Sequence, residues 1–443
     1  MDIGTIKGII KDQREEIEEK LKSKDAIKRE YLPLSKNYLK HPNILTILGV
    51  RRCGKSFFSM QISNLIKANT GYINFEDERL ASIKVQHLDK VLQAFYELYG
   101  KINFIILDEI QNVEKWELFA ARLRRTKKVI ITGSNSRLLS GELATHLTGR
   151  HIDITISPFS FREISPIKQP LTTFEIAKTR KLLERYLNSS SFPEYRIFGK
   201  SIVRVIYEDI IYKDCIRRYK IKKEGAFREL TYYLISNFSN EFSYSKLAKM
   251  FKLGDVHTAK NYVSYLENSY AIITLKRFSY KLKEQELAPR KTYNIDQGFS
   301  NFVAFKQTKD VGKIYENTVL VDLLRRNVLN ETYSETYYYK TPNCEVDFII
   351  KQANKVKQLI QVCYNINDLK TKEREIRALI KASKELKCKN LLVITDDYEA
   401  EKQEKWFGTK RKVRFTPLWK WLLKEADDKA DNKFRKHNRR SPT

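Results

Sequence analysis

The residues in this sequence best suited to chemistry on phosphate lie in GVRRCGKS, residues 49–56. This segment fits the pattern G-x-x-x-x-G-K-[S/T], whose glycines let backbone N–H groups wrap around phosphate oxygens. Lys55 would reach the β- and γ-phosphates of a nucleotide, and the Ser56 hydroxyl would bind Mg²⁺. Arg51 and Arg52 could point toward the nucleotide or toward a neighbouring domain. The predicted nucleotide-binding residues are Gly49, Val50, Arg51, Arg52, Cys53, Gly54, Lys55, Ser56 and Phe57.

A pair of acids, Asp108 and Glu109, follows the apolar run 104–107. We expect Asp108 to hold Mg²⁺ through water and Glu109 to polarise the water that attacks the nucleotide. An ordinary strand with a charged end would look the same locally. The phosphate-loop pattern upstream favours the catalytic interpretation.

A second group of polar residues, Ser134 and Asn135, ends the apolar run in VIITGSNS. They could contact the γ-phosphate or the attacking water, or they could cap the next helix. Arg150, in LTGRHI, could neutralise the γ-phosphate in its own subunit or in a neighbouring one, or it could be a surface arginine. The predicted catalytic residues are therefore Lys55, Glu109, Ser134, Asn135 and Arg150, and the predicted metal ligands are Ser56 and Asp108.

These side chains need a sheet that brings several strand ends to one edge. Short apolar runs, each with a polar end, alternate with helical patterns: ILTILGV, GYINFED, INFIILDE and KKVIITGS. This alternation predicts a parallel sheet with helices on both faces. An amphipathic helix with Ile6, Ile9, Ile10 and Ile17 at close to helical spacing precedes it.

Together with INFED, ILDEIQNVEKWE, ITGSNSRLLSGELATHLTGR and SPFSFREI, the phosphate loop resembles the AAA-type ATPases of bacteria and archaea. In these proteins a phosphate-loop domain precedes a winged helix and a C-terminal domain of unknown function. The resemblance covers residues 20–423 and implies ATP as the nucleotide and a relation to switch ATPases. The absence of an Asn-Lys-x-Asp motif, which reads guanine, agrees with ATP.

The middle of the chain fits a winged helix-turn-helix. Its first two predicted helices are FRELTYYLISNFS and SYSKLAKMFKL, and Ser243 or Ser245 would cap the second. Gly254 would make the next turn, and Asp255 would cap the third helix. Such a domain either lays its third helix in the major groove of DNA or packs against the nucleotide site. The expected apolar face of the third helix is Val256, Ala259, Val263 and Leu266. The basic residues of the expected wing are Lys276, Arg277, Lys281 and Lys283.

The C-terminal part resembles the restriction-endonuclease core, with Glu316 on a helix and Glu345 and Asp347 on a strand. Some members of the family that this chain resembles have Glu-Val-Lys on the next strand. This chain has Gln361-Val362-Cys363 there. Glutamine lacks the charge that attracts a divalent cation, and cysteine cannot replace an ammonium. We therefore expect this domain to be catalytically silent. The tyrosines 337–339 indicate strand packing or, alternatively, base stacking.

The chain has 443 residues and a net charge of +29 at pH 7, with clusters such as KDCIRRYKIKK, which has six basic residues and one acid. This surplus favours a polyanion and predicts DNA as a partner, although a genome that favours lysine would give the same surplus. A protein partner or self-association stays open. Five irregularly spaced cysteines argue against a disulfide framework. Neither a signal peptide nor an apolar run of eighteen residues is evident, so we expect a cytoplasmic protein that does not span a membrane.

The sequence thus predicts a multidomain α/β protein with a P-loop NTPase core. Its predicted parts are a helical extension (1–40), the P-loop ATPase core (41–165), a helical lid or linker (166–225), the winged helix-turn-helix (226–290), the restriction-endonuclease-like domain (291–425) and a basic disordered tail (426–443). The predicted function is ATP hydrolysis by a switch or motor that acts on DNA. The alternative is a nucleotide-gated DNA-binding regulator with little ATP turnover.

Overall fold

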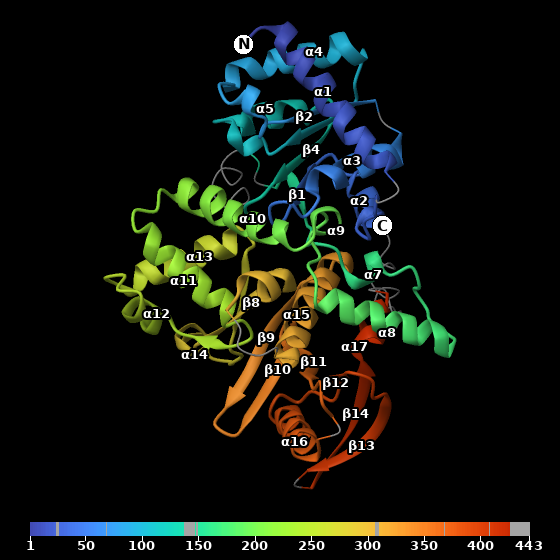
Figure 1. Ribbon diagram of the computed structural model, residues 1–443, viewed down its shortest axis with the longest axis vertical. Helices are drawn as coiled ribbons and strands as arrows, with labels where there is room; N and C mark the ends of the chain where they lie inside the picture. Colours follow the sequence, from blue (N-terminus) through green and yellow to red (C-terminus); the bar gives the residue numbers. More distant parts are fainter. Residues whose placement is uncertain are drawn as a thin grey trace, which may run out of the picture. The chain divides into compact units, whose positions relative to one another are not determined.

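The computed structural model describes residues 1–23, 26–67, 69–136, 147, 149–305, 310–366, 368–406 and 408–425 (Figure 1). The predicted tail, 426–443, lies outside these residues. The chain divides into two compact units. Unit 1 comprises residues 1–164, 188–274 and 292–307, and unit 2 comprises residues 165–187, 275–291 and 308–443. Within the described residues, no helix combines the length and the apolar character needed to cross a membrane.

Unit 1 begins with a five-stranded parallel sheet of order β2-β3-β4-β1-β5, which confirms the predicted sheet type. Its strands are β1 (Ile44–Leu48), β2 (Thr70–Asn74), β3 (Phe104–Asp108), β4 (Lys128–Gly133) and β5 (His151–Thr155). Residues on β1, β3 and β4 are buried along almost their whole length, as expected for strands covered on both faces. The parallel arrangement brings the carboxyl ends of β1, β3 and β4 to one edge.

Helices α1 (Ile3–Lys22), α3 (Lys55–Ile66), α4 (Leu88–Tyr99) and α5 (Trp116–Leu123) pack against this sheet. Helix α2 (Leu32–Tyr38) packs against α3, and the short helix α7 (Phe161–Ile164) follows β5. The predicted N-terminal helix is α1, capped by Asp2, and it lies beside α4 (Figure 1). Ile6, Ile9 and Ile10 join the apolar core that α4, α5 and the strands form. Packing of this apolar face, rather than helix propensity, holds α1 in place.

The rest of unit 1 is mostly helical. It contains α9 (Tyr195–Phe198), α10 (Ser201–Asp209), the π-helical segment η5 (Ile210–Arg217), α11 (Glu224–Ser236), α12 (Tyr244–Met250), α13 (Val256–Asn268) and η6 (Phe299–Val303). A small sheet of order β6-β8-β7 completes it, with β6 (Glu241–Phe242), β7 (Ile272–Lys276) and β8 (Arg290–Asn294). The last residues of β7 and the first of β8 belong to unit 2.

The caps expected on α12 and α13 are present. The Ser243 hydroxyl accepts from the N–H of Lys246, and the Asp255 carboxylate accepts from the N–H of Thr258. Gly254 has φ 90°, which favours glycine at the turn between them. One predicted core position is wrong: Val256 is 47% exposed, because it is the first residue of α13 and precedes the buried turns, where Tyr262 packs instead.

Unit 2 is built on a six-stranded mixed sheet of order β13-β14-β12-β11-β10-β9. Its strands are β9 (Ser334–Thr341), β10 (Cys344–Gln352), β11 (Lys355–Val362), β12 (Leu391–Thr395), β13 (Ala400–Trp406) and β14 (Thr409–Pro417). Its helices are α8 (Thr173–Leu187), α14 (Leu282–Leu287), α15 (Val311–Leu329), α16 (Leu369–Glu385) and α17 (Leu418–Leu423). Strands β9, β10 and β11 are antiparallel neighbours, and α16 connects β11 to the parallel strand β12.

Candidate functional site

The phosphate-loop segment forms the turn between β1 and α3. Gly49 has φ 150°, and a Cβ built on it would lie 2.2 Å from the Ile156 carbonyl oxygen, so no larger residue fits. Gly54 has φ 94° and precedes Lys55, the first residue of α3. The N-terminus of this twelve-residue helix therefore opens onto the loop, where its N–H groups favour an anion.

Lys55 is buried in this loop. Its ammonium donates to the carbonyl oxygens of Gly49 and Val50, at 3.2 Å each, and lies 3.3 Å from Glu109 Oε1. Burial lowers the pKa of Lys55, but the Glu109 carboxylate, together with Cys53 and Asp214, outweighs burial, so that the pKa is raised. Lys55 therefore carries its charge at neutral pH, as contact with a phosphate requires.

Glu109 follows β3 and is held in the left-handed region of backbone conformation, with φ 51°. Its N–H donates to Thr132 Oγ1 at 3.0 Å, and its carboxylate accepts from Gln111 Nε2 and from the N–H of Ser134. Burial alone would raise its pKa, but Lys55 and then Arg51 outweigh burial and lower the pKa of this carboxyl. Glu109 is therefore ionised at neutral pH and able to accept a proton.

Asp108, the last residue of β3, is fully buried. It accepts hydrogen bonds from the Tyr72 hydroxyl at 2.8 Å and from Thr132 Oγ1. Burial raises the pKa of Asp108, and the neighbouring Glu109 raises it further. The Ser56 hydroxyl lies close enough to this carboxylate to lower its pKa in part. A hydroxyl beside a buried carboxylate is a ligand set that Mg²⁺ accepts, so these two residues fit the predicted metal site.

Ser134 and Asn135 follow β4 and turn toward the helical part of unit 1. Ser134 Oγ donates to Asp214 Oδ1 at 3.0 Å, and Asn135 Nδ2 donates to the Tyr219 hydroxyl at 3.2 Å. The backbone N–H of Ser134 also reaches Glu109, at 3.3 Å from Oε2. Ser134 thus lies at the same edge as the acid pair. The helix that these residues were alternatively expected to cap would fall on residues 137–146, outside the described residues.

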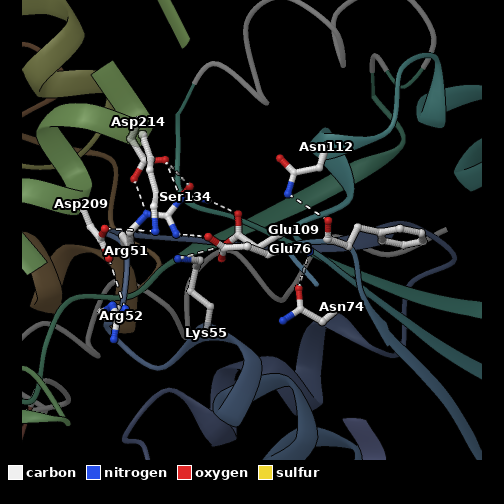
Figure 2. Close-up of polar contacts among 12 residues, drawn as sticks. Arg51, Arg52, Lys55, Asn74, Glu76, Glu109, Asn112, Ser134, Asp209 and Asp214 are labelled. Carbon is white, nitrogen blue, oxygen red and sulfur yellow. Dashed lines mark hydrogen bonds and ion pairs between the residues drawn. The ribbon is translucent and has the colours of Figure 1, made fainter. Parts of the chain in front are cut away.

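The two loop arginines are tied to acids outside the loop, as Figure 2 shows. Arg51 donates to both Asp214 oxygens, at 2.8 and 3.1 Å, and also contacts Glu76. Arg52 pairs with Glu194 at 2.7 Å and with Asp209 at 3.2 Å. These partners come from the end of β2 and from residues 194–214, so both arginines join the loop to other segments of unit 1.

A cavity of about 490 Å³ opens at this loop. The loop side chains on its wall are Arg51, Arg52, Lys55, Ser56 and Phe57. Val50 and Cys53 are fully buried and are absent from that wall. Helix α1 and residues 193–197 supply much of the remaining wall, including Ile17, Pro193 and Ile197. The wall combines cations with apolar side chains, which suits a nucleotide with charged phosphates and an apolar base.

Arg150 is not brought to this cavity. It is exposed and directly precedes β5, and its carbonyl oxygen accepts from the N–H of Ile44 at the start of β1. The phosphate loop leaves the other end of β1, after Leu48. Arg150 therefore lies at the opposite edge of the sheet from Lys55.

Sequence reasoning missed Asp214 and Arg29. Asp214 is the single acid in the basic segment 213–223, and that exception was its only signal. Arg29 is 1% exposed and donates to Cys53 O at 2.8 Å, Ser157 O at 2.6 Å and Glu163 Oε1 at 2.8 Å. Arg29 thus holds the phosphate loop through the Cys53 carbonyl. It belongs to no recognisable sequence motif.

Unit 2 gathers a second set of charged side chains around Lys291. The ammonium of this buried lysine lies 2.8 Å from Glu345, 3.1 Å from Glu316 and 3.8 Å from Asp347. Burial alone would lower the pKa of Lys291, but the three carboxylates outweigh burial and raise it. Sequence analysis had named the three acids but not their cation.

Gln361 lies beside this cluster on β11. Its Oε1 accepts from the N–H of Asp347 at 3.3 Å, and its Nε2 donates to Glu375 Oε2 at 2.6 Å. The uncharged amide thus bridges the backbone of Asp347 and the carboxylate of Glu375. Burial raises the pKa of Asp347 well above its usual range, and Glu316 raises it further. Cys363 packs in the apolar core with α16.

Comparisons with known proteins agree with the phosphate-loop site. The family model of an AAA domain matches residues 41–165, and two domains of unknown function, DUF8612 and DUF4143, match residues 180–310 and 311–420. An uncharacterized protein of Methanocaldococcus jannaschii is 36% identical over 401 residues, which cover 86% of this chain and 89% of that protein. An uncharacterized protein of Haemophilus influenzae is 29% identical over 362 residues, covering 78% and 88%.

Among solved structures, a Walker-type ATPase of Pyrococcus abyssi covers 63% of this chain and 96% of its own, with a TM-score of 0.39 and 14% identity. The AAA domain match confirms the predicted P-loop ATPase domain. The winged helix and the nuclease-like domain stay predictions.

Proposed function

This chain belongs to the family of its Methanocaldococcus jannaschii relative and carries an AAA domain, and on that premise we propose that it binds ATP with Mg²⁺ and hydrolyses the bond to the γ-phosphate. The observation that carries the proposal is the pairing of Lys55 with Glu109 at the mouth of the phosphate loop. A charged lysine for the phosphates and an ionised acid for the attacking water then lie in one site.

The chemistry divides among four side chains. Lys55 neutralises the transferred phosphate, and Ser56 and Asp108 would hold Mg²⁺, which supplies further positive charge to the phosphates. Glu109 orients the attacking water and accepts its proton. Ser134, whose N–H donates to Glu109, fixes the direction of that carboxylate.

The test is phosphate release from ATP and Mg²⁺ by the full chain and by Lys55→Ala. We expect measurable release by the wild type and none above background by the variant. Equal release by the two proteins would overturn the assignment of the site. The same assay with double-stranded DNA present would show whether DNA accelerates turnover.

We further propose that residues 226–290 form a winged helix that binds DNA. The supporting features are the order α11, β6, α12, α13, β7, α14 and β8, in which a short helix separates the last two strands, and the exposed cations on α12 and α13 and between them. These cations are Lys246, Lys249, Lys252 and Lys260. An array of exposed lysines around a helix-turn-helix suits the phosphates of a duplex.

A second candidate function is a nucleotide-gated DNA-binding regulator with little turnover. It is favoured by the contacts of Arg51 and Arg52 with residues 194–214, which offer a route from nucleotide to the helical part. A DNA-binding titration in ATP and in ADP, at several salt concentrations, separates the two candidates. Affinity that depends on nucleotide without DNA-stimulated hydrolysis supports the regulator.

For unit 2 we propose a nuclease-like domain that does not cut. The Lys291 ammonium already pairs with Glu316, Glu345 and Asp347, the acids that a metal would need. Incubation of the full chain with plasmid and Mg²⁺ or Mn²⁺ tests this. We expect intact supercoiled plasmid; nicking that Asp347→Ala abolishes would contradict the proposal.

A further inference from the structure

Arg51 is the loop residue most firmly bound to another part of unit 1. Its guanidinium forms a bidentate pair with Asp214, a side chain that is only 1% exposed, and it also contacts Glu76 (Figure 2). Bidentate charged pairs of this kind are directional and strong. The loop is therefore joined to η5, a segment 163 residues away in the sequence.

Asp214 also contacts the acid side of the site. Its Oδ1 accepts from the Ser134 hydroxyl, and the Ser134 N–H donates to Glu109. A continuous chain of contacts thus runs from the carboxylate of Glu109 to η5. Asp214 therefore contacts both Ser134, which is bonded to Glu109, and Arg51 of the phosphate loop.

The charges at this point are nearly balanced. Three carboxylates, from Glu76, Glu109 and Asp214, face two cations, Arg51 and Lys55. Arg51 and Lys55 line the same cavity, and both interact electrostatically with Glu109. A γ-phosphate beside Lys55 would bring more negative charge to this cavity than ADP does, and it would compete with Asp214 for Arg51.

We propose that Asp214 is a positioning residue that senses the γ-phosphate, because it and the terminal phosphate of ATP compete for Arg51. When Arg51 turns to the phosphate, Asp214 loses its bidentate partner and η5 loses its tie to the loop. The ATP-bound and ADP-bound states then differ in the contact between Arg51 and Asp214, which the γ-phosphate of ATP displaces. A nucleotide switch requires such a difference between its two states. This inference rests on the proposed ATP site and assigns its regulation.

The experiment compares the affinities of the full chain for ATP and ADP, measured by calorimetry with Mg²⁺. Asp214→Asn removes the competing charge but keeps the shape of the side chain. We expect the ratio Kd(ADP)/Kd(ATP) to rise by about fivefold or more, a typical size for coupling between sites. Arg51→Gln should lower the ratio, and in that background Asp214→Asn should have no further effect.

Glu208→Gln is the matched control, because it removes the same charge six residues earlier and its partner is Arg228, at 2.6 Å. Its ratio should equal that of the wild type. A ratio that Asp214→Asn leaves unchanged, or that it changes equally with and without Arg51, would overturn the sensor while leaving ATP binding intact. If the wild type binds neither nucleotide, the proposed function and the sensor both fail.

Discussion

Lys55 and Glu109 form a buried ion pair, with 3.3 Å between Lys55 Nζ and Glu109 Oε1. Each partner shifts the pKa of the other toward the charged form, against the effect of burial. The pair thus keeps a phosphate-binding cation and a proton-accepting carboxylate charged over the whole neutral range. The pairing also fixes Glu109 near the position that the γ-phosphate must take, as the proposed hydrolysis needs.

Glu109→Gln should therefore stop hydrolysis without stopping ATP binding. The amide cannot accept a proton from water, so we expect kcat to fall by about 100-fold or more. Loss of one negative charge beside the phosphates should leave ATP affinity equal or tighter. Phosphate release and calorimetric titration measure the two effects. Glu114→Gln, an exposed acid five residues further along, should behave as wild type; hydrolysis that persists in Glu109→Gln would mean that another base acts.

Arg29 gives a second prediction, about the support of the loop. Arg29→Met removes one partner of a fully buried ion pair, and with it the guanidinium that donates to Glu163 and to two carbonyl oxygens. We expect a loss of about 3 kcal/mol in the free energy of unfolding and weaker ATP binding, because the Cys53 carbonyl belongs to the loop.

Thermal unfolding of the variant with and without ATP and Mg²⁺ measures both effects. Arg79→Met is the control, because Arg79 is 43% exposed and its pairs with Asp12 and Asp77 lie at the surface. Exposed pairs of this kind contribute little to stability. Equal losses in Arg29→Met and Arg79→Met would refute the supporting role of Arg29.

The sheet and the residues on its edge could be predicted because they depend on local patterns. The apolar runs before Asp108 and Ser134 predict buried strands, and parallel strands bring their ends together. Asp214 could not be predicted in this way, because a single acid in a basic segment acquires its role only when folding brings it to Arg51. Lys291 is a similar case, since its three acids lie 25 to 56 positions away in the sequence. Long-range ion pairs leave no periodic signal.

The proposed DNA contact gives a third prediction. Lys260 is exposed on α13, so Lys260→Ala should weaken DNA binding at all sequences alike. Loss of one phosphate contact should reduce the slope of log K against log salt by about 0.9. Fluorescence anisotropy with a labelled duplex at several salt concentrations measures this slope. Lys90→Ala, an exposed lysine on α4, should keep the wild-type slope; the same slope in both variants would remove α13 from the interface.

Lys291 gives a fourth prediction, for unit 2. Lys291→Met leaves three neighbouring carboxylates without their shared cation, and we expect a loss of about 3 kcal/mol in the free energy of unfolding. The raised pKa of Lys291 sets the pH range: its contribution is complete below the ordinary lysine value of 10.5 and is lost as pH rises through the folded pKa. The difference in the free energy of unfolding between the wild type and Lys291→Met should therefore be constant from neutral pH to about pH 10 and become smaller above that.

Denaturant unfolding of both proteins across this range, followed by a probe in unit 2, measures the deficit. Glu345→Gln is the comparison, since it removes a partly exposed acid that also pairs with Lys340. We expect a smaller loss there, because the cation keeps Glu316 and Asp347. A deficit in Lys291→Met that grows with pH would mean that the buried lysine is neutral.

The last prediction concerns Gln361, whose uncharged side chain lies on β11. Gln361→Glu supplies the acid expected at this position of the proposed nuclease-like core, but it places a carboxylate against Glu375, whose Oε2 accepts from the Gln361 amide at 2.6 Å. Two facing carboxylates share a proton, so the pKa of the new pair should be raised. A carboxyl group whose pKa is higher in the folded state than in the unfolded state stabilises the folded protein at low pH. This stabilisation is lost as the pH rises through the folded pKa.

The melting temperature of Gln361→Glu should therefore lie further below that of the wild type at pH 8 than at pH 5, with a loss of about 1–3 kcal/mol at the higher pH. Gln358→Glu, on the same strand, should show little change, because the Gln358 amide donates to the side-chain oxygen of Asn390, at 3.4 Å, rather than to a carboxylate. If Gln361→Glu is instead as stable as the wild type and nicks plasmid with Mg²⁺, then Gln361 alone silences the domain. Lys291 would then not be the cation that keeps a metal out.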